Sequence, residues 1–173
     1  MKCCLLVLIS ILLATAGCGY HVSGHSDLLP KTVKTIAIPP FANVTTRYKL
    51  TDSIPSSLMR EFASRTSRYQ IVNNPDQADA VLRGAVVNYL SFPVVSDQKT
   101  GRATAVQISV FLNISLVERA TGKVLFNRPN MEVRQRYEIS SDQVAYFEES
   151  GTALQRVSQE VARAVVSAIL EAF

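Results

Sequence analysis

The chain has 173 residues, of which 47% are hydrophobic and 18% charged, and its formal net charge is +4. This length fits one domain with a real core, and the hydrophobic content excludes a disordered chain. No cluster of Lys and Arg indicates nucleic-acid binding, and no apolar stretch reaches the ~20 residues of a membrane-spanning helix.

The first residues have the pattern of a signal peptide. Lys2 supplies a positive start, residues 5–13 are mainly apolar, and the small residues 15–17 lead into Cys18. Secretory signals combine these features, with an apolar region of about 7–15 residues. We therefore expect residues 1–17 to be a cleaved signal peptide.

Cys18 is the residue that we expect to carry a lipid. Its position after small residues resembles a bacterial lipobox, although Thr15 stands where that pattern usually carries Leu. Cleavage removes Cys3 and Cys4, so no intramolecular disulfide can form, and an acylated sulfur is inert in an oxidising compartment. We expect residues 18–32 to be a lipidated tether. The alternative is a plain secretory signal with an incidental Cys18.

Residues 33–173 predict a single domain. Its expected elements, in chain order, are a strand over 33–39, a polar loop over 43–49, a helix from 53 to about 67, a short strand or edge extension over 69–72, long strands over 78–93, 106–116 and 124–139, and a final helix over 154–172. Pro39 and Pro40 end the first strand, because neither residue donates to a sheet ladder.

The first helix is predicted from its start signal and its apolar stripe. Ser53 is a good N-cap, and Pro55 is tolerated in a first turn, where no hydrogen bond is lost. Apolar residues then recur at helical spacing at Ile54, Leu58 and Phe62. This stripe predicts one buried helix face.

The long strands are predicted from period-two alternation, which is clearest over 106–116. Loops at 96–102 and 120–123 predict hairpins, so the neighbouring strands are expected to be antiparallel. Pro93 indicates a sheet edge or a bend, and the return strand is expected to be interrupted at 128–130.

The final helix presents apolar residues on one face, and a short helix over 142–149 is expected to break before Gly151. The element order predicts an α+β fold. We expect a two-layer sandwich in which two helices pack on one face of a mixed, mostly antiparallel sheet of about four strands.

The chain offers few residues for chemistry. His21 and His25 lie in the tether without a carboxylate or cysteine cluster, which argues against a metal site or a Ser-His-Asp triad. Glu148 and Glu149 are adjacent and point in different directions, so they do not form a catalytic pair. There is no phosphate-binding glycine motif. We expect no enzyme activity, no metal and no cofactor.

Several segments together resemble the LptE family of lipopolysaccharide-assembly lipoproteins. In family order, they are the start CGYHVSG at 18–24, IAIPPF at 36–41 followed by Asn43 and Thr45, ADAVLRG at 78–84, the ATGKVL turn at 120–125 and the helix over 163–173. The turn alone is unspecific, whereas the start combined with the element order is much stronger. The resemblance covers essentially the whole chain after residue 17.

The resemblance implies a binding role at the outer membrane. Proteins of this family sit in the lumen of the LptD β-barrel as a plug, assist its assembly and bind lipopolysaccharide on its way to the outer leaflet. For this chain it implies an N-acyl diglyceride with palmitate on Cys18. Gly19, in place of an Asp, favours sorting to the outer membrane. We expect a lipid-anchored protein that faces the periplasm and the barrel lumen, with LptD and lipopolysaccharide as partners and no nucleic acid.

Arg and Lys are the natural donors to the phosphates of such a ligand. The candidate residues are Lys99 and Arg102 in the 96–102 loop and Arg134 and Arg136 on the return strand. The alternative is that all four are ordinary surface charges, which is the stronger alternative for the strand pair because acidic residues flank it.

Two other functions stay open at this point. The first is an assembly or pilot lipoprotein for a different outer-membrane barrel or secretin. The second is an envelope hydrolase whose catalytic residues follow no known motif. Co-purification with a large barrel separates the first from an LptE-like protein, and turnover of cell-wall or lipid substrates would reveal the second.

Overall fold

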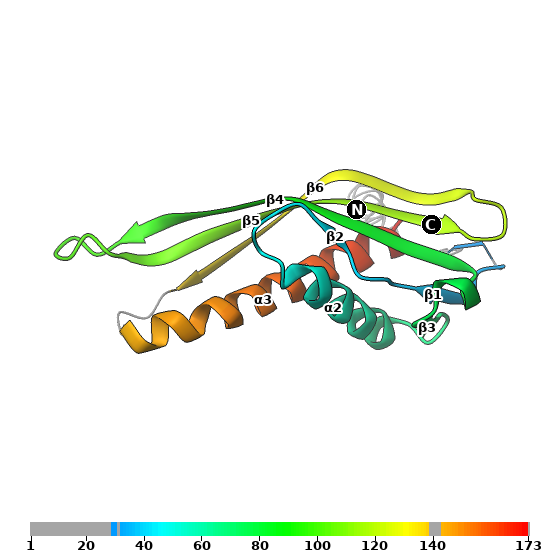
Figure 1. The fold of residues 1–173 in the computed structure, drawn as a ribbon, viewed down its shortest axis with the longest axis horizontal. Helices are drawn as coiled ribbons and strands as arrows, with labels where there is room; N and C mark the ends of the chain where they lie inside the picture. Colours follow the sequence, from blue (N-terminus) through cyan, green and yellow to red (C-terminus); the bar gives the residue numbers. More distant parts are fainter. Residues whose placement is uncertain (1–28, 31, 139–142, 173) are drawn as a thin grey trace, which may run out of the picture.

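The computed structural model describes residues 29–30, 32–138 and 143–172, without the side chains of 143–150. Its elements are β1 (Thr35–Ala37), β2 (Ala42–Asn43), α2 (Leu50–Arg65), β3 (Gln70–Val72), the 3-10 helix η1 (Pro75–Gln77), β4 (Ala80–Ser96), β5 (Ala103–Glu118), β6 (Val124–Glu138) and α3 (Gln143–Leu170). Helices α2 and α3 cover one side of a sheet (Figure 1), which confirms the expected α+β sandwich. In the described residues, no helix is long and apolar enough to cross a membrane.

The sheet has six strands rather than about four. Its order is β3-β1-β4-β5-β6, and β2 pairs with β4 beside that path. The pairs β1–β3, β1–β4 and β2–β4 are parallel, whereas β4–β5 and β5–β6 are antiparallel, so the sheet is mixed as expected. The strands β2 and β3 have two and three residues, too few for an alternating pattern to predict them firmly.

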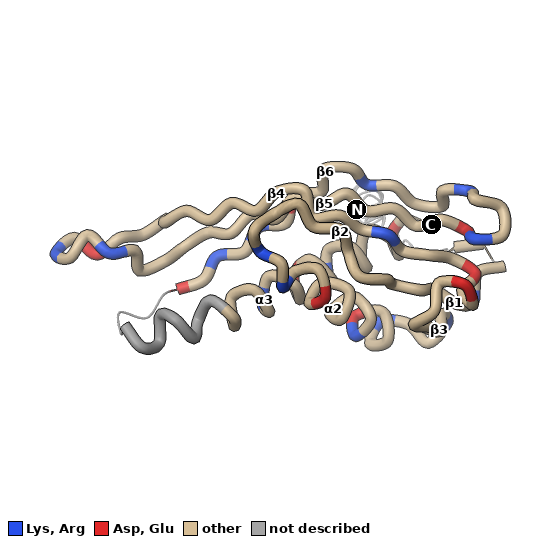
Figure 2. Tube along the Cα trace, viewed as in Figure 1, with Lys and Arg blue, Asp and Glu red and all other residues tan. Residues whose placement is uncertain are grey.

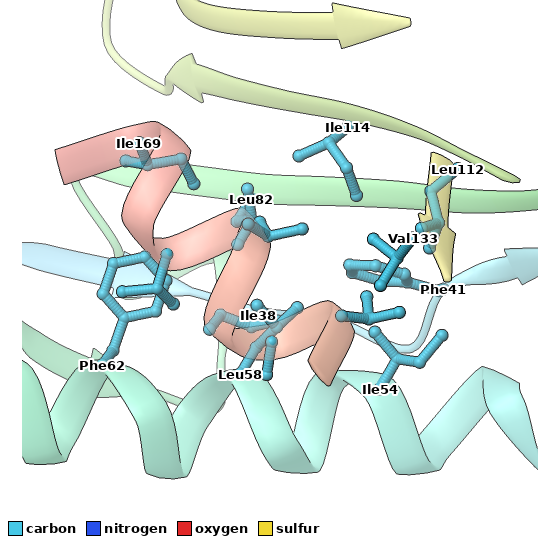
Figure 3. Close-up of a cluster of buried hydrophobic side chains, with 14 of the residues drawn as sticks. Ile38, Phe41, Ile54, Leu58, Phe62, Leu82, Leu112, Ile114, Val133 and Ile169 are labelled. Carbon is cyan, nitrogen blue, oxygen red and sulfur yellow. The ribbon is translucent and has the colours of Figure 1, made fainter. Parts of the chain in front are cut away.

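The alternation along β5 decides which side of the sheet is the core. One set of β5 side chains is almost fully buried under the helices, as predicted; the set is Ile108, Val110, Leu112, Ile114 and Leu116. These side chains pack with Ile54, Leu58 and Phe62 of α2 and with Ile169 of α3 (Figure 3). The opposite side of β5 belongs to the helix-free face of the sheet, called the outer face below.

Helix α2 begins at Leu50, three residues before the predicted N-cap Ser53, because Leu50 is fully buried and extends the apolar stripe. Pro55 therefore lies inside the helix rather than in its first turn. Its missing N–H leaves the Thr51 carbonyl oxygen without its usual helical donor. The Phe41 N–H donates to that oxygen at 3.0 Å, so the helix tolerates the proline and is tied to the β1–β2 segment.

The predicted interruption at residues 128–130 is a β-bulge within a continuous strand. Leu112 pairs with Met131 and Ile114 pairs with Arg128, so β6 has one extra residue there. Asn130 takes a positive φ of 50°, and its N–H donates to the side-chain oxygen Oδ1 of Asn113 at 2.9 Å. Asn tolerates this conformation, and a bulge accommodates a proline without ending the strand.

The predicted break before Gly151 is wrong, because α3 continues through this residue. A glycine inside a helix costs only about 1 kcal/mol relative to alanine. The following turns bury Ala153, Val157 and Val161 in the core, and this burial outweighs the local cost.

Asp79 joins the first strand to β4. Its Oδ2 accepts hydrogen bonds of 2.9 Å from the Lys34 N–H, the Thr35 N–H and the Thr35 hydroxyl. These bonds, first of all the one from the Lys34 N–H, hold the pKa of Asp79 below its ordinary value. The Asp79 carbonyl oxygen also accepts from the Arg119 N–H at 2.8 Å. The carboxylate therefore acts as a structural acceptor at this end of the sheet.

Several predictions fall outside the described residues. They concern the signal peptide over 1–17, the lipidated Cys18, most of the tether over 18–32, and His21 and His25. All of these stay predictions.

Candidate functional site

The end of the β4–β5 hairpin extends beyond the strands that flank β4 on its other side. β1 pairs with β4 only at Ala80 and Val81, and β2 pairs with it only at Ala85 and Val86. Beyond Val86, β4 has β5 as its only neighbour within the described sheet. We call residues 87–110 the distal arm; it projects at the left of Figure 1, beyond α2.

The tip of the distal arm is a turn organised by Asp97. Its Oδ1 accepts from the backbone N–H groups of Lys99 and Thr100, at 2.9 and 2.7 Å, and from the Thr100 hydroxyl at 3.0 Å. These bonds, the strongest being that from the Thr100 N–H, lower the pKa of Asp97. The predicted ligand residues Lys99 and Arg102 are both exposed in this turn. Figure 2 shows Lys or Arg positions at the tip of the arm.

The second predicted pair lies on the outer face of β6. Arg134 donates two hydrogen bonds of 2.7 Å to the carboxylate of Glu132, and this pairing lowers the pKa of Glu132. Glu132 therefore neutralises part of the positive charge of Arg134. Arg136 is exposed two residues further along the same face, opposite Gln107 of β5.

The strand register brings both pairs to the same end of the molecule. Gln107 lies between Arg136 on β6 and Phe92 on β4, and the Lys99–Arg102 turn follows a few residues beyond Phe92. Four cations that are spread over 38 positions of the sequence thus belong to one region, the distal arm and its β6 neighbour. Their role as ligand contacts stays a prediction.

The distal arm also exposes an apolar surface that sequence reasoning missed. Four large hydrophobic side chains on β4 are about 40% exposed; they are Leu90, Phe92, Val94 and Val95. The sequence did contain an indication of this apolar surface, because residues 87–96 include no charged residue. Alternation predicted this strand but could not show which face of its far half stays uncovered.

A shallow groove lies between the two helices. Its volume is about 310 Å³, and Lys49, Arg60 and several serines of α2 face Leu154 and Gln155 of α3 across it. The serine hydroxyls and Arg60 there already have hydrogen-bond partners within the protein. Ser53 shares a hydrogen bond of 2.9 Å with Ser158, Ser56 donates to the Asp52 carbonyl, and Arg60 donates to Ser57. The groove therefore offers no set of polar groups that converge on a ligand.

The described residues hold no group of three or more His, Cys, Asp or Glu side chains that could bind a metal ion. The side chains that the arm does offer are cations beside apolar surface. This combination suits an amphipathic anion, with charge–charge contacts at one end and apolar contacts along β4.

Comparison with known proteins places these features in a family. The LptE family, described as Lipopolysaccharide-assembly, matches residues 33–169 of the chain, which is most of its length. No match was found among curated proteins.

Solved structures show that the fold recurs in other proteins. The hypothetical protein CT253 from Chlamydia trachomatis superposes with a TM-score of 0.52 at 12% identity, over 80% of this chain and 96% of that one. Protein XCC0632 from Xanthomonas campestris gives 0.51 at 14% identity, over 83% and 87%. At these identities the likeness concerns the fold alone.

Proposed function

Because the chain belongs to the LptE lipopolysaccharide-assembly family, we propose that it is an outer-membrane lipoprotein that delivers lipopolysaccharide through a barrel partner. The observation that carries this proposal is the family match over residues 33–169. The role is one of binding and assembly, without catalysis. The barrel partner is LptD, whose lumen the domain plugs and whose assembly it assists.

The proposed anchor is an N-acyl diglyceride on Cys18, formed after removal of residues 1–17. Thr32, next to the domain entrance, donates a hydrogen bond of 3.0 Å to Glu118, the last residue of β5. The arm tip lies at the opposite end of β5, which at about 3.3 Å per residue is roughly 50 Å away. The chain thus enters the domain at one end of the sheet and presents its basic tip at the other, an arrangement suited to spanning a long lumen.

The proposed ligand contacts are the cations of the distal arm. Lys99 and Arg102 are exposed at the tip, and Asp97 between the strands is engaged by the turn itself. Charge-assisted hydrogen bonds from such residues to phosphate are among the stronger polar contacts that proteins make. Arg136 extends the same basic surface onto β6, whereas Arg134 shares its charge with Glu132.

A pull-down of the tagged full-length protein from detergent-solubilised outer membranes tests the proposal. We expect one large β-barrel protein, LptD, to co-purify in near-equal amount together with lipopolysaccharide. The matched control is Cys18→Ala, which should lose both partners because it lacks the anchor. Recovery of a different barrel or of a secretin, with no lipopolysaccharide, would contradict the proposal.

A further inference from the structure

We propose that the acyl chains of the lipopolysaccharide ligand lie against the apolar segment of the distal arm, defined as Leu90, Phe92, Val94 and Val95. This inference rests on the proposed function and adds to it which part of the ligand meets which part of the protein. The phosphates would meet the cations at the tip and on β6, and the chains would meet β4.

The exposed apolar side chains are concentrated in a short stretch of one strand. Leu90, Phe92 and Val95 pair with Ser109, Gln107 and Ala105, so all three belong to the outer face of the sheet. Each is between 42% and 44% exposed. Contiguous apolar surface of this kind on a soluble domain usually marks a binding surface.

The backbone of this segment is poorly suited to pair with a strand of another protein. Pro93 has no N–H, and the Tyr89 N–H is already bonded to the Asn88 side chain at 2.8 Å. Register shifts lie between Val86 and Asn88 and between Pro93 and Val95, so the edge is bulged twice. Proline and bulges are the features by which edge strands resist strand addition. An occupant must therefore be bound through side chains.

An apolar occupant bound by side chains alone, close to cations, has the chemistry of a phosphorylated lipid. Arg136 lies level with Phe92, two strand spacings or about 10 Å away across the outer face. The intervening position is the uncharged Gln107, so no acidic side chain separates them. β6, the edge strand on the other side of β5, carries Glu132, Arg134, Arg136 and Glu138 and offers no comparable apolar stretch.

Binding of two forms of the ligand to the purified full-length protein in detergent tests this inference. The probes are intact lipopolysaccharide and lipopolysaccharide freed of its acyl chains by alkali, which keeps its sugars and phosphates. The test variant is Leu90→Ser with Phe92→Ser. The matched control is Val124→Ser, because Val124 is 54% exposed on the outer face at the far end of the sheet.

We expect the double variant to bind intact lipopolysaccharide roughly tenfold more weakly than the wild type, at the level of the deacylated form. Its affinity for the deacylated form should not change, and Val124→Ser should bind both probes like the wild type. Thermal unfolding checks that all variants fold, which is expected because these side chains are partly exposed.

The other outcomes overturn the inference in distinguishable ways. Unchanged affinity of the double variant for intact lipopolysaccharide would exclude the apolar segment as the acyl site while leaving the proposed function in place. Loss of the barrel partner by the double variant in the outer-membrane pull-down, with unchanged lipopolysaccharide binding of the purified protein, would identify the segment as a protein-docking surface. Failure of the wild type to bind either probe would contradict the proposed function itself.

Discussion

At the scale of single residues, Gly84 on β4 makes room for the ring of Phe41. A Cβ added at Gly84 would overlap three atoms of that ring, and Phe41 is only 2% exposed, so the ring cannot swing into solvent. We expect Gly84→Ala to lower the free energy of unfolding by about 1–3 kcal/mol, as overpacking of a core does. Urea denaturation measures this loss.

The control for Gly84→Ala is the same substitution in a Phe41→Leu background. The smaller side chain leaves space for the new methyl group, so the added penalty should shrink. An equal penalty in both backgrounds would show that the ring contact is not the cause.

Asp79 makes stability depend on pH in a defined direction. Its pKa in the folded protein is below its value of about 3.9 in the unfolded chain. Its contribution is therefore complete above that value and is lost as the pH falls through the folded pKa. We expect Asp79→Asn to have a lower free energy of unfolding than the wild type at pH 7. This difference should become smaller below about pH 4.

Urea unfolding of both proteins at pH 7 and pH 3 checks this behaviour. The matched control is Asp76→Asn, three residues earlier in the exposed helix η1. Its free energy of unfolding should be close to that of the wild type at both pH values. If the difference in free energy of unfolding between Asp79→Asn and the wild type stays constant across this pH range, the three hydrogen bonds stabilise the protein independently of the charge.

At the scale of elements, α3 carries an internal glycine without a packing reason. Nothing lies within 4 Å of a Cβ added at Gly151, and the residue is exposed. We expect Gly151→Ala to raise the free energy of unfolding by about 0.5–1 kcal/mol, through the higher helix propensity of alanine. A lower midpoint in chemical denaturation would contradict this and would indicate that the helix needs to bend at this position.

Elements with a long, regular pattern were predictable from the sequence. The alternation over β5 and the apolar stripe of α2 identified their buried faces, because burial of every second or every third to fourth side chain leaves a period in the sequence. Helix α2 begins earlier than predicted. The prediction took Ser53 as the N-cap, whereas burial of Leu50 in the core extends the helix by three residues. The strand β2 left no such signal, since its two residues are held by pairing with β4.

The candidate site was predictable only in part. Charge identified the cations, and the loop composition placed Lys99 and Arg102 in a hairpin turn. Their proximity to Arg136 depends on the register of β4, β5 and β6, and bulges at Val87, Val94 and in the 128–130 segment shift that register. The exposure of Phe92 follows from its place on the helix-free outer face, and a strand pattern does not report which face of the sheet stays uncovered.

At the scale of the whole molecule, the two ends of the sheet have different compositions and different connections. The end near Thr32 receives the chain and also exposes Arg119 and Lys123, while the other end carries Lys99, Arg102 and the exposed apolar segment. This polarity supports a protein that is tethered at one end and binds its ligand at the other.

The cations of the tip give the clearest prediction at this scale. We expect Lys99→Glu with Arg102→Glu to weaken lipopolysaccharide binding by at least about tenfold, because attraction to phosphate becomes repulsion. The fold should not change, since both side chains are exposed in the turn. Binding of the purified protein at low and high salt measures the effect. Unchanged affinity would leave these residues as ordinary surface charges.

Photo-crosslinking in living cells tests the central claim most directly. A photo-reactive residue placed at Lys99, in the arm tip, should form an adduct with lipopolysaccharide on illumination, whereas one placed at Val124, at the opposite end of the sheet, should not. Adducts of equal yield from both positions, or from Val124 alone, would contradict the assignment of the distal arm as the ligand-binding end.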